Sequence, residues 1–206
     1  MQWISDHAPA INAIAGVLTL FVWLFYAQLL YNGYIRQRRA RLIINRGQGK
    51  DIDSLCLISN MSAEAIFIQH IVVRIETSQE PLLLDVSDYQ QSNDDGQTEY
   101  RSHQGPLSSG GYLHIGSFKE LIQRVADAHG IELDGHRPSG ELTFKVIELR
   151  VIAIYGSEDQ PVGARRRFIL DDDGDACSIT PAQLDTQRLA RRRDRRLVKQ
   201  WMRNLE

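Results

Sequence analysis

The chain has 206 residues, a length that suits one ordinary domain with an additional segment and argues against a multidomain enzyme. Its two cysteines, Cys56 and Cys177, exclude a disulfide-rich secreted scaffold and a zinc site of four thiolates. The net charge of −2 conceals a segregation, since residues 1–50 carry +5, residues 51–175 carry −12 and residues 176–206 carry +5. These three blocks are expected to have different surroundings.

A long apolar stretch follows a short N-terminal segment of residues 1–10. Residues 11–35 contain no Asp, Glu, Lys or Arg, and about 20 such residues in a helix match the ~30 Å thickness of the bilayer core. Apolar side chains point in every direction around this helix, whereas a buried core helix usually keeps a polar stripe. A cleaved secretory signal is disfavoured because no basic region precedes the stretch. The sequence therefore predicts a single transmembrane helix over residues 11–35.

Basic residues after this helix define its orientation. An excess of Lys and Arg within about 15–20 residues of a span keeps that flank in the cytoplasm. Residues 36–50 form a basic juxtamembrane segment, which predicts a plasma (inner) membrane protein with its N-terminus outside. The arginines either contact anionic headgroups as topology determinants, the favoured interpretation, or form a specific lipid or partner site. These membrane-surface candidates are Arg36, Arg38, Arg39, Arg41 and Arg46.

Short β-branched runs separated by turn residues predict a mainly β domain over residues 51–175. The fold expected is an antiparallel β-sandwich, with an immunoglobulin-like arrangement as one option that no Cys and Trp pair strengthens. A change of hydrophobic phase after Val146 predicts a bulge or a bend in the longest strand. Ser117 to Glu120 form a capping box that begins one short helix, and Gly130 is placed to end it. The strands are expected near residues 54–59, 65–77, 81–86, 112–115, 141–155 and 165–170.

The last block, residues 176–206, is expected to form a basic amphipathic helix. Thr180, Pro181 and Gln183 supply an N-cap, a first-turn proline and a capping-box residue. Such a helix binds a membrane surface, a protein partner or the acidic domain of its own chain, and the sequence leaves these alternatives open. Nucleic acid is a weaker candidate, because no nucleic-acid motif or stacking platform accompanies the arginines. The candidate tail residues are Arg192, Arg195, Arg196, Lys199, Trp201 and Arg203.

Catalytic motifs are not found in the sequence. Phosphate-binding loops, H-E-x-x-H and G-x-S-x-G do not occur, so we expect neither an enzyme nor a cofactor. An enzyme with a dispersed site built from His103, His114 and carboxylates around Asp94 ranks last among the hypotheses. Nothing in the sequence brings those groups together.

An acidic run resembles the first half of an EF-hand calcium loop. Its candidate ligands are Asp171, Asp173 and Asp175. Ala176 replaces the glycine that such a loop needs, and no glutamate occupies the closing bidentate position. An acidic turn that only solvates the end of a strand is therefore the favoured interpretation.

The leading functional prediction combines the apolar helix with the charge blocks. It is a single-pass, membrane-anchored interaction or scaffold protein, in contact with the lipid bilayer and with a protein partner or further copies of itself. The alternative is a membrane-tethered ligand or calcium sensor that uses residues 171–175 and the tail helix as a switch.

Overall fold

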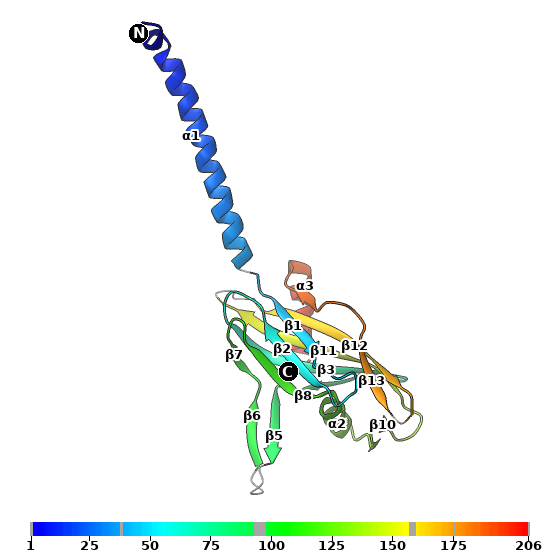
Figure 1. Ribbon diagram of the computed structural model, residues 1–206. Helices are drawn as coiled ribbons and strands as arrows, with labels where there is room; N and C mark the ends of the chain where they lie inside the picture. The colour runs from blue at the N-terminus through cyan, green and yellow to red at the C-terminus, as the bar shows by residue number, and fades with distance from the viewer. Residues whose placement is uncertain (1, 38, 93–97, 157–159, 175, 206) are drawn as a thin grey trace. The chain divides into compact units, whose positions relative to one another are not determined.

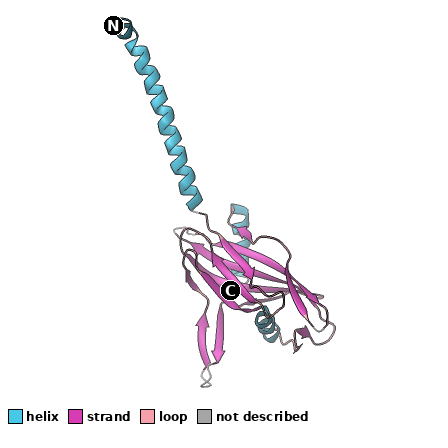
Figure 2. Cartoon of the chain, in the orientation of Figure 1, coloured by secondary structure: helices cyan, strands magenta, loops and turns pink. Residues whose placement is uncertain are grey.

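The computed structural model describes residues 2–37, 39–92, 98–156, 160–174 and 176–205. The chain divides into two compact units, Met1–Arg39 and Ala40–Glu206. The first unit consists of the helix α1 (Gln2–Gln37), and the second contains every strand and two shorter helices (Figures 1 and 2).

Helix α1 carries the apolar stretch that the sequence analysis singled out. Its residues His7–Tyr34 are, among the described helices, the one segment long and apolar enough to cross a membrane. Large side chains such as Phe21, Trp23 and Leu30 are 63%, 69% and 74% exposed. An N-terminal apolar helix is therefore confirmed.

The second unit is mainly β, as predicted, and its strands pair antiparallel. A three-stranded sheet has the order β1 (Leu42–Arg46), β2 (Leu55–Asn60), β8 (Tyr112–Ser117). A seven-stranded sheet has the order β13 (Cys177–Pro181), β12 (Val162–Asp172), β11 (Phe144–Tyr155), β3 (Ile66–Thr77), β4 (Leu82–Asp85), with β14 (Gln187–Leu189) paired to β12 and β7 (Gly105–Leu107) paired to β3. The remaining strands form the hairpins β5 (Asp88–Ser92) with β6 (Thr98–Ser102) and β9 (Leu133–Asp134) with β10 (Arg137–Pro138).

The two larger sheets share one hydrophobic core. Ile44 and Ile58 from the three-stranded sheet are fully buried in the same cluster as Ile71, Ile147 and Phe168 from the seven-stranded sheet. Burial of this apolar area from both sheets is the main force that holds them together. The arrangement fits a β-sandwich, and the immunoglobulin-like label stays a prediction.

The short helix α2 (Phe118–Ala128) forms as the sequence predicts. Ser117 Oγ accepts a hydrogen bond from Glu120 N at 3.2 Å, and Glu120 Oε2 accepts one from Ser117 N at 2.8 Å. Phe118, Leu121 and Val125 are buried on one side of the helix. Gly130 follows the helix with φ +67°, a conformation that favours glycine.

The predicted irregularity in the longest strand is also present. The register of β11 against β3 shifts between Phe144 and Val146, and again between Ile152 and Ala153. Each shift is a bulge or irregularity that changes which side chains face the core.

The β domain extends beyond the range that the sequence predicted, at both ends. Residues 36–50 were expected to be a juxtamembrane segment, but β1 lies within it, and Leu42 and Ile44 are buried. Residues 176–206 were expected to be one helix, but β13 and β14 come first and the helix α3 (Arg192–Arg203) begins only after them. The start of this block forms a strand rather than a helix because strand pairing buries Cys177 and Ile179 in the core.

Candidate functional site

The apolar side of α3 packs on the β domain of its own chain. Val198 and Trp201 are buried in a small cluster with Ile152 of β11 and Leu189 of β14. Since Leu149, Val151 and Ala153 belong to the main core, Ile152 and α3 lie on the opposite face of the seven-stranded sheet. Trp201, a candidate for lipid or partner contact, is only 6% exposed here.

The approach of α3 to the sheet is close at Gly163 in β12. A Cβ atom at this position would lie 2.7 Å from Val198 Cγ2. A real Cβ does not tolerate such a distance, so glycine is what allows α3 to sit at this depth.

The substitution Gly163→Ala is expected to loosen α3 without unfolding the sheets. Overpacking costs about 1–3 kcal/mol, so hydrogen exchange of the α3 amides should accelerate roughly 5- to 150-fold. Gly47→Ala is the matched control, because its Cβ would meet Leu55 N at an ordinary 3.5 Å. Equal exchange rates in α3 for both variants would contradict the tight packing described above.

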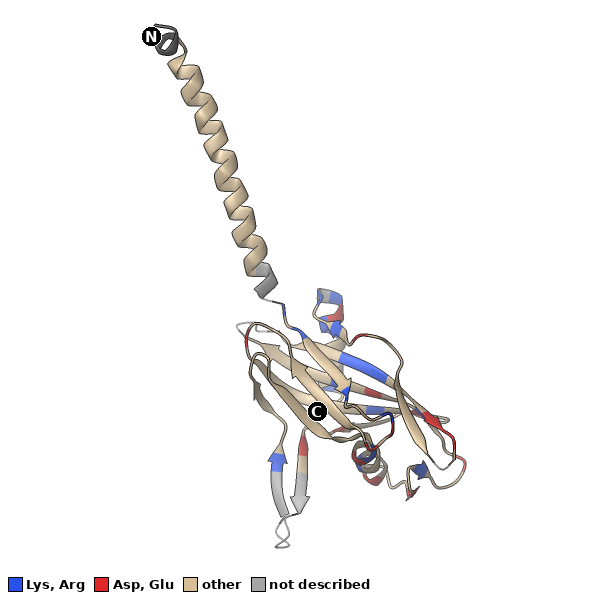
Figure 3. Ribbon diagram, in the orientation of Figure 1, with Lys and Arg blue, Asp and Glu red and all other residues tan. Residues whose placement is uncertain are grey.

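The docked helix presents its basic side to solvent. Six of the twelve residues of α3 are Lys or Arg, and its one acidic residue lies in the first turn; Figure 3 shows blue and red segments along this helix. That residue, Asp194, accepts a hydrogen bond from Arg191 N at 3.3 Å, while Arg195 Nε donates to Ala190 O at 2.9 Å. The side chain of Arg192 lies outside the described residues. We define the basic α3 surface by its exposed members, Arg193, Arg196, Lys199 and Arg203.

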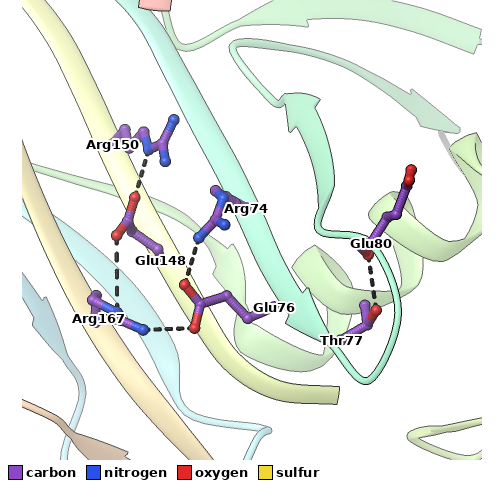
Figure 4. A network of polar contacts seen from close by, with 7 residues as sticks. All are labelled: Arg74, Glu76, Thr77, Glu80, Glu148, Arg150 and Arg167. Atoms are coloured by element: carbon purple, nitrogen blue, oxygen red, sulfur yellow. Dashed lines mark hydrogen bonds and ion pairs between the residues drawn. The ribbon is translucent and has the colours of Figure 1, made fainter. Parts of the chain in front are cut away.

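An ion-pair network lies on the same face of the sheet as Ile152 and α3, and Figure 4 shows its members. Glu148 of β11, whose side chain is 4% exposed, pairs with Arg150 at 2.5 Å and lies 3.9 Å from Arg167 Nε. Glu76 of β3 pairs with Arg74 and Arg167, each at 2.6 Å. Hydrogen bonding by Arg74 and the charge of Arg167 hold the pKa of Glu76 below its usual value.

Arg150 connects this network to α3. Its guanidinium carbon lies 4.5 Å from the centroid of the Trp201 ring, a cation–π contact. The network therefore joins β3, β11 and β12 to the helix, and its three arginines outnumber its two glutamates. No sequence signal predicted this network, because its members meet only through strand register.

The predicted membrane-surface arginines have different environments. Arg39 and Arg41 are exposed, and the backbone N of Arg41 donates to Ser62 Oγ at 2.6 Å. Arg46 lies in β1, and its Nη1 donates to Ile179 O at 2.5 Å, so it holds β1 against β13. Arg38 and the side chain of Arg36 lie outside the described residues.

Within the acidic run that begins at Asp171, Asp172 contacts other side chains of the domain. Asp172 accepts hydrogen bonds from Arg137 Nε and Nη2 at 2.6 and 2.7 Å and lies 3.0 Å from His136 Nε2. These partners hold the pKa of Asp172 far below its usual range, with hydrogen bonding by Arg137 as the largest cause. Asp171 and Asp173 are exposed, and Asp175 lies outside the described residues. No three His, Cys, Asp or Glu side chains in the described ranges are grouped to hold a metal, and the calcium hypothesis stays a prediction.

A cleft of about 1240 Å³ lies between α2, β8 and the base of the β5–β6 hairpin. It brings together His103 and His114, the two histidines of the dispersed-site hypothesis, whereas Asp94 lies outside the described residues. The Tyr89 ring stacks on His103, with ring centroids 4.5 Å apart and an interplanar angle of 19°. Arg124 of α2 donates through Nη2 to Asp88 O at 2.8 Å and to Val86 O at 3.4 Å.

The electrostatics of this cleft are mixed. Burial lowers the pKa of His103, and the electrostatic effects of Arg124 and of the neighbouring His114 lower it further, while Asp88 opposes them. Burial also lowers the pKa of Arg124. Carboxylates line the cleft as well, at Asp88, Glu120 and Asp127.

Comparison with protein-family models, with curated proteins and with solved structures finds no match for this chain. A function for the basic α3 surface or for the cleft must therefore be argued from the residues that form them.

Proposed function

We propose that this chain is a single-pass, membrane-anchored interaction protein that tethers a partner complex at the plasma (inner) membrane. Helix α1 is long enough for the bilayer core, since 28 residues at 1.5 Å per residue exceed its ~30 Å. The arginines after it favour an N-terminus outside and a β domain in the cytoplasm. The β domain then begins at Ala40, directly after the anchor.

The observation that carries this proposal is the way α3 is docked. An interfacial helix binds lipid by inserting its apolar side chains among the headgroups. In α3 those side chains, Val198 and Trp201, are buried in the domain, so the surface left for recognition is cationic. A protein with an acidic surface is the partner that fits such a surface, because complementary charge speeds association and excludes wrong partners.

The proposal is tested by reversing the charge of the basic α3 surface. The full chain carrying Arg193→Glu, Arg196→Glu and Lys199→Glu is expected to lose at least 90% of the protein partner recovered after crosslinking in membranes and purification in detergent, relative to the unaltered chain. The physical reason is that reversed charge on this surface repels an acidic partner and slows its association.

The control changes the same amount of charge elsewhere. Lys50, Lys119 and Lys145 are exposed and lie outside α3, so their joint replacement by Glu should leave recovery unchanged. Equal recovery with both triple variants would refute binding through α3. If neither another protein nor a second copy of the chain is recovered with the unaltered chain or with the control variant, the interaction role is refuted.

A further inference from the structure

We propose that the cleft between α2, β8 and the β5–β6 hairpin binds a phosphate group, with Arg124 as the anchor and His103 and His114 as further donors. This site goes beyond the interaction role proposed above and uses none of the basic α3 surface.

Arg124 is a half-buried cation that forms no ion pair with a described residue, although the charges of Asp85 and Glu120 act on it from a distance and its guanidinium carbon lies 6.0 Å from the centroid of the Tyr89 ring. Its Nη2 donates to two backbone carbonyls, and no carboxylate of the described residues forms an ion pair with it. Its Nε and Nη1 find no acceptor within the described part of the chain. A guanidinium presents a planar fork of donors that matches the oxygens of a phosphate, and charge-assisted hydrogen bonds of this kind are the strong ones.

The two histidines add donors from other elements. His114 lies in β8, is exposed and makes no side-chain hydrogen bond to a described residue. His103 follows β6 and is held in place by its stack on Tyr89. A neutral imidazole still donates one N–H, so both rings can serve an oxyanion at neutral pH. Arg101 also lines the cleft and adds positive charge.

The carboxylates of the cleft oppose an anion to different degrees. Glu120 Oε2 is engaged by Ser117 N, and Asp127 Oδ1 accepts a hydrogen bond from Gln123 Nε2 at 2.7 Å. The carboxylate of Asp88 makes no such contact with a described residue. Asp88 is therefore expected to repel the ligand, which gives a test of opposite sign to the removal of Arg124.

The size of the cleft indicates what carries the phosphate. About 1240 Å³ is much more than an inorganic ion fills, and Leu84, Ile115 and Ala128 provide apolar walls. An organic phosphate fits better. It is either a soluble phosphorylated compound or the headgroup of a phospholipid.

The test uses the full chain in a neutral detergent, with inorganic phosphate as the first probe in calorimetry. We expect saturable binding that Arg124→Met weakens about tenfold or more, that His114→Asn weakens about threefold and that Asp88→Asn strengthens about threefold. Lys119→Met is the matched control, because it removes one charge from the same helix outside the cleft and should leave the affinity unchanged. Glycerol 3-phosphate and dihexanoyl phosphatidic acid then distinguish the two sources by which of them binds more tightly than inorganic phosphate.

Arg124→Met also removes two hydrogen bonds to backbone carbonyls, so the exposed substitutions at His114 and Asp88 keep the test decisive when that variant folds poorly. Opposite shifts for His114→Asn and Asp88→Asn support the site. Absence of saturable phosphate binding, or the same affinity in these variants and in the Lys119→Met control, would overturn it without affecting the interaction role.

Discussion

A cysteine placed at Gln79 is expected to react with a membrane-impermeant maleimide only after cells are opened. Gln79 is exposed in the turn between β3 and β4, and the arginines after α1 are expected to keep this part of the chain in the cytoplasm. A cysteine introduced at Gln2 should instead react in intact cells. We expect labelling at position 79 to rise from near zero in intact cells to near complete in opened cells, and labelling at position 2 to be near complete in both, measured by the mass shift of the purified chain.

The two native cysteines are not expected to react with the maleimide. Cys56 and Cys177 are buried, and burial raises the pKa of both, that of Cys177 to about 11. Because the thiolate is the reactive form, the unaltered chain is the control and should stay unlabelled. Labelling of the Gln79 cysteine in intact cells would reverse the proposed orientation, and extraction of the protein by salt without detergent would contradict the anchor.

The substitution Arg166→Met is expected to lower the free energy of unfolding by about 2–4 kcal/mol. Arg166 is 7% exposed, and its Nη1 donates to Ile44 O at 2.7 Å while its Nη2 donates to Leu184 O at 2.9 Å. One side chain of β12 thus holds β1 and the segment before β14, and its loss removes the charge-assisted hydrogen bonds to Ile44 O and Leu184 O, leaving Ile44 O with Thr186 Oγ1 as its remaining side-chain donor. Denaturant unfolding of the full chain in detergent, followed by circular dichroism, measures the change.

Arg165→Met is the matched control for this experiment. Arg165 is the neighbour of Arg166 in β12, its side chain is less buried, and its Nε donates to Gln187 Oε1 at 2.7 Å. We expect a loss below about 1 kcal/mol, as for an exposed polar contact. A similar loss for both variants would show that Arg166 has no special structural role.

The features that the sequence predicts well are those formed by residues close to one another in the chain. The capping box at Ser117 and the phase change after Val146 depend on neighbours within a few residues, and both are present in the structure. The apolar helix is recognisable for the same reason, since length and composition alone define it.

The features that sequence analysis missed depend on pairing between distant residues. β1 was not recognised because arginines precede it and Arg46 ends it, and its pairing to β2 decides its structure. The start of the tail was misjudged because Thr180 and Pro181 fit a helix cap, whereas pairing to β12 makes them the end of a strand. His103 and His114 were named together in the lowest-ranked hypothesis, but their shared cleft depends on β8 lying beside the base of the hairpin, which no spacing in the sequence reveals.

The first strand of the β domain is completed by the last part of the chain. Ile44 N donates to Thr186 Oγ1, and Arg46 and Arg166 tie the same region to residues near positions 179–184. During synthesis, β1 leaves the ribosome long before these contacts exist, so the domain cannot reach its final packing until the C-terminal residues are made. In the membrane-anchored role proposed above, α1 would be available for insertion while the rest of the polypeptide is still unfolded, which would separate membrane targeting from folding in time.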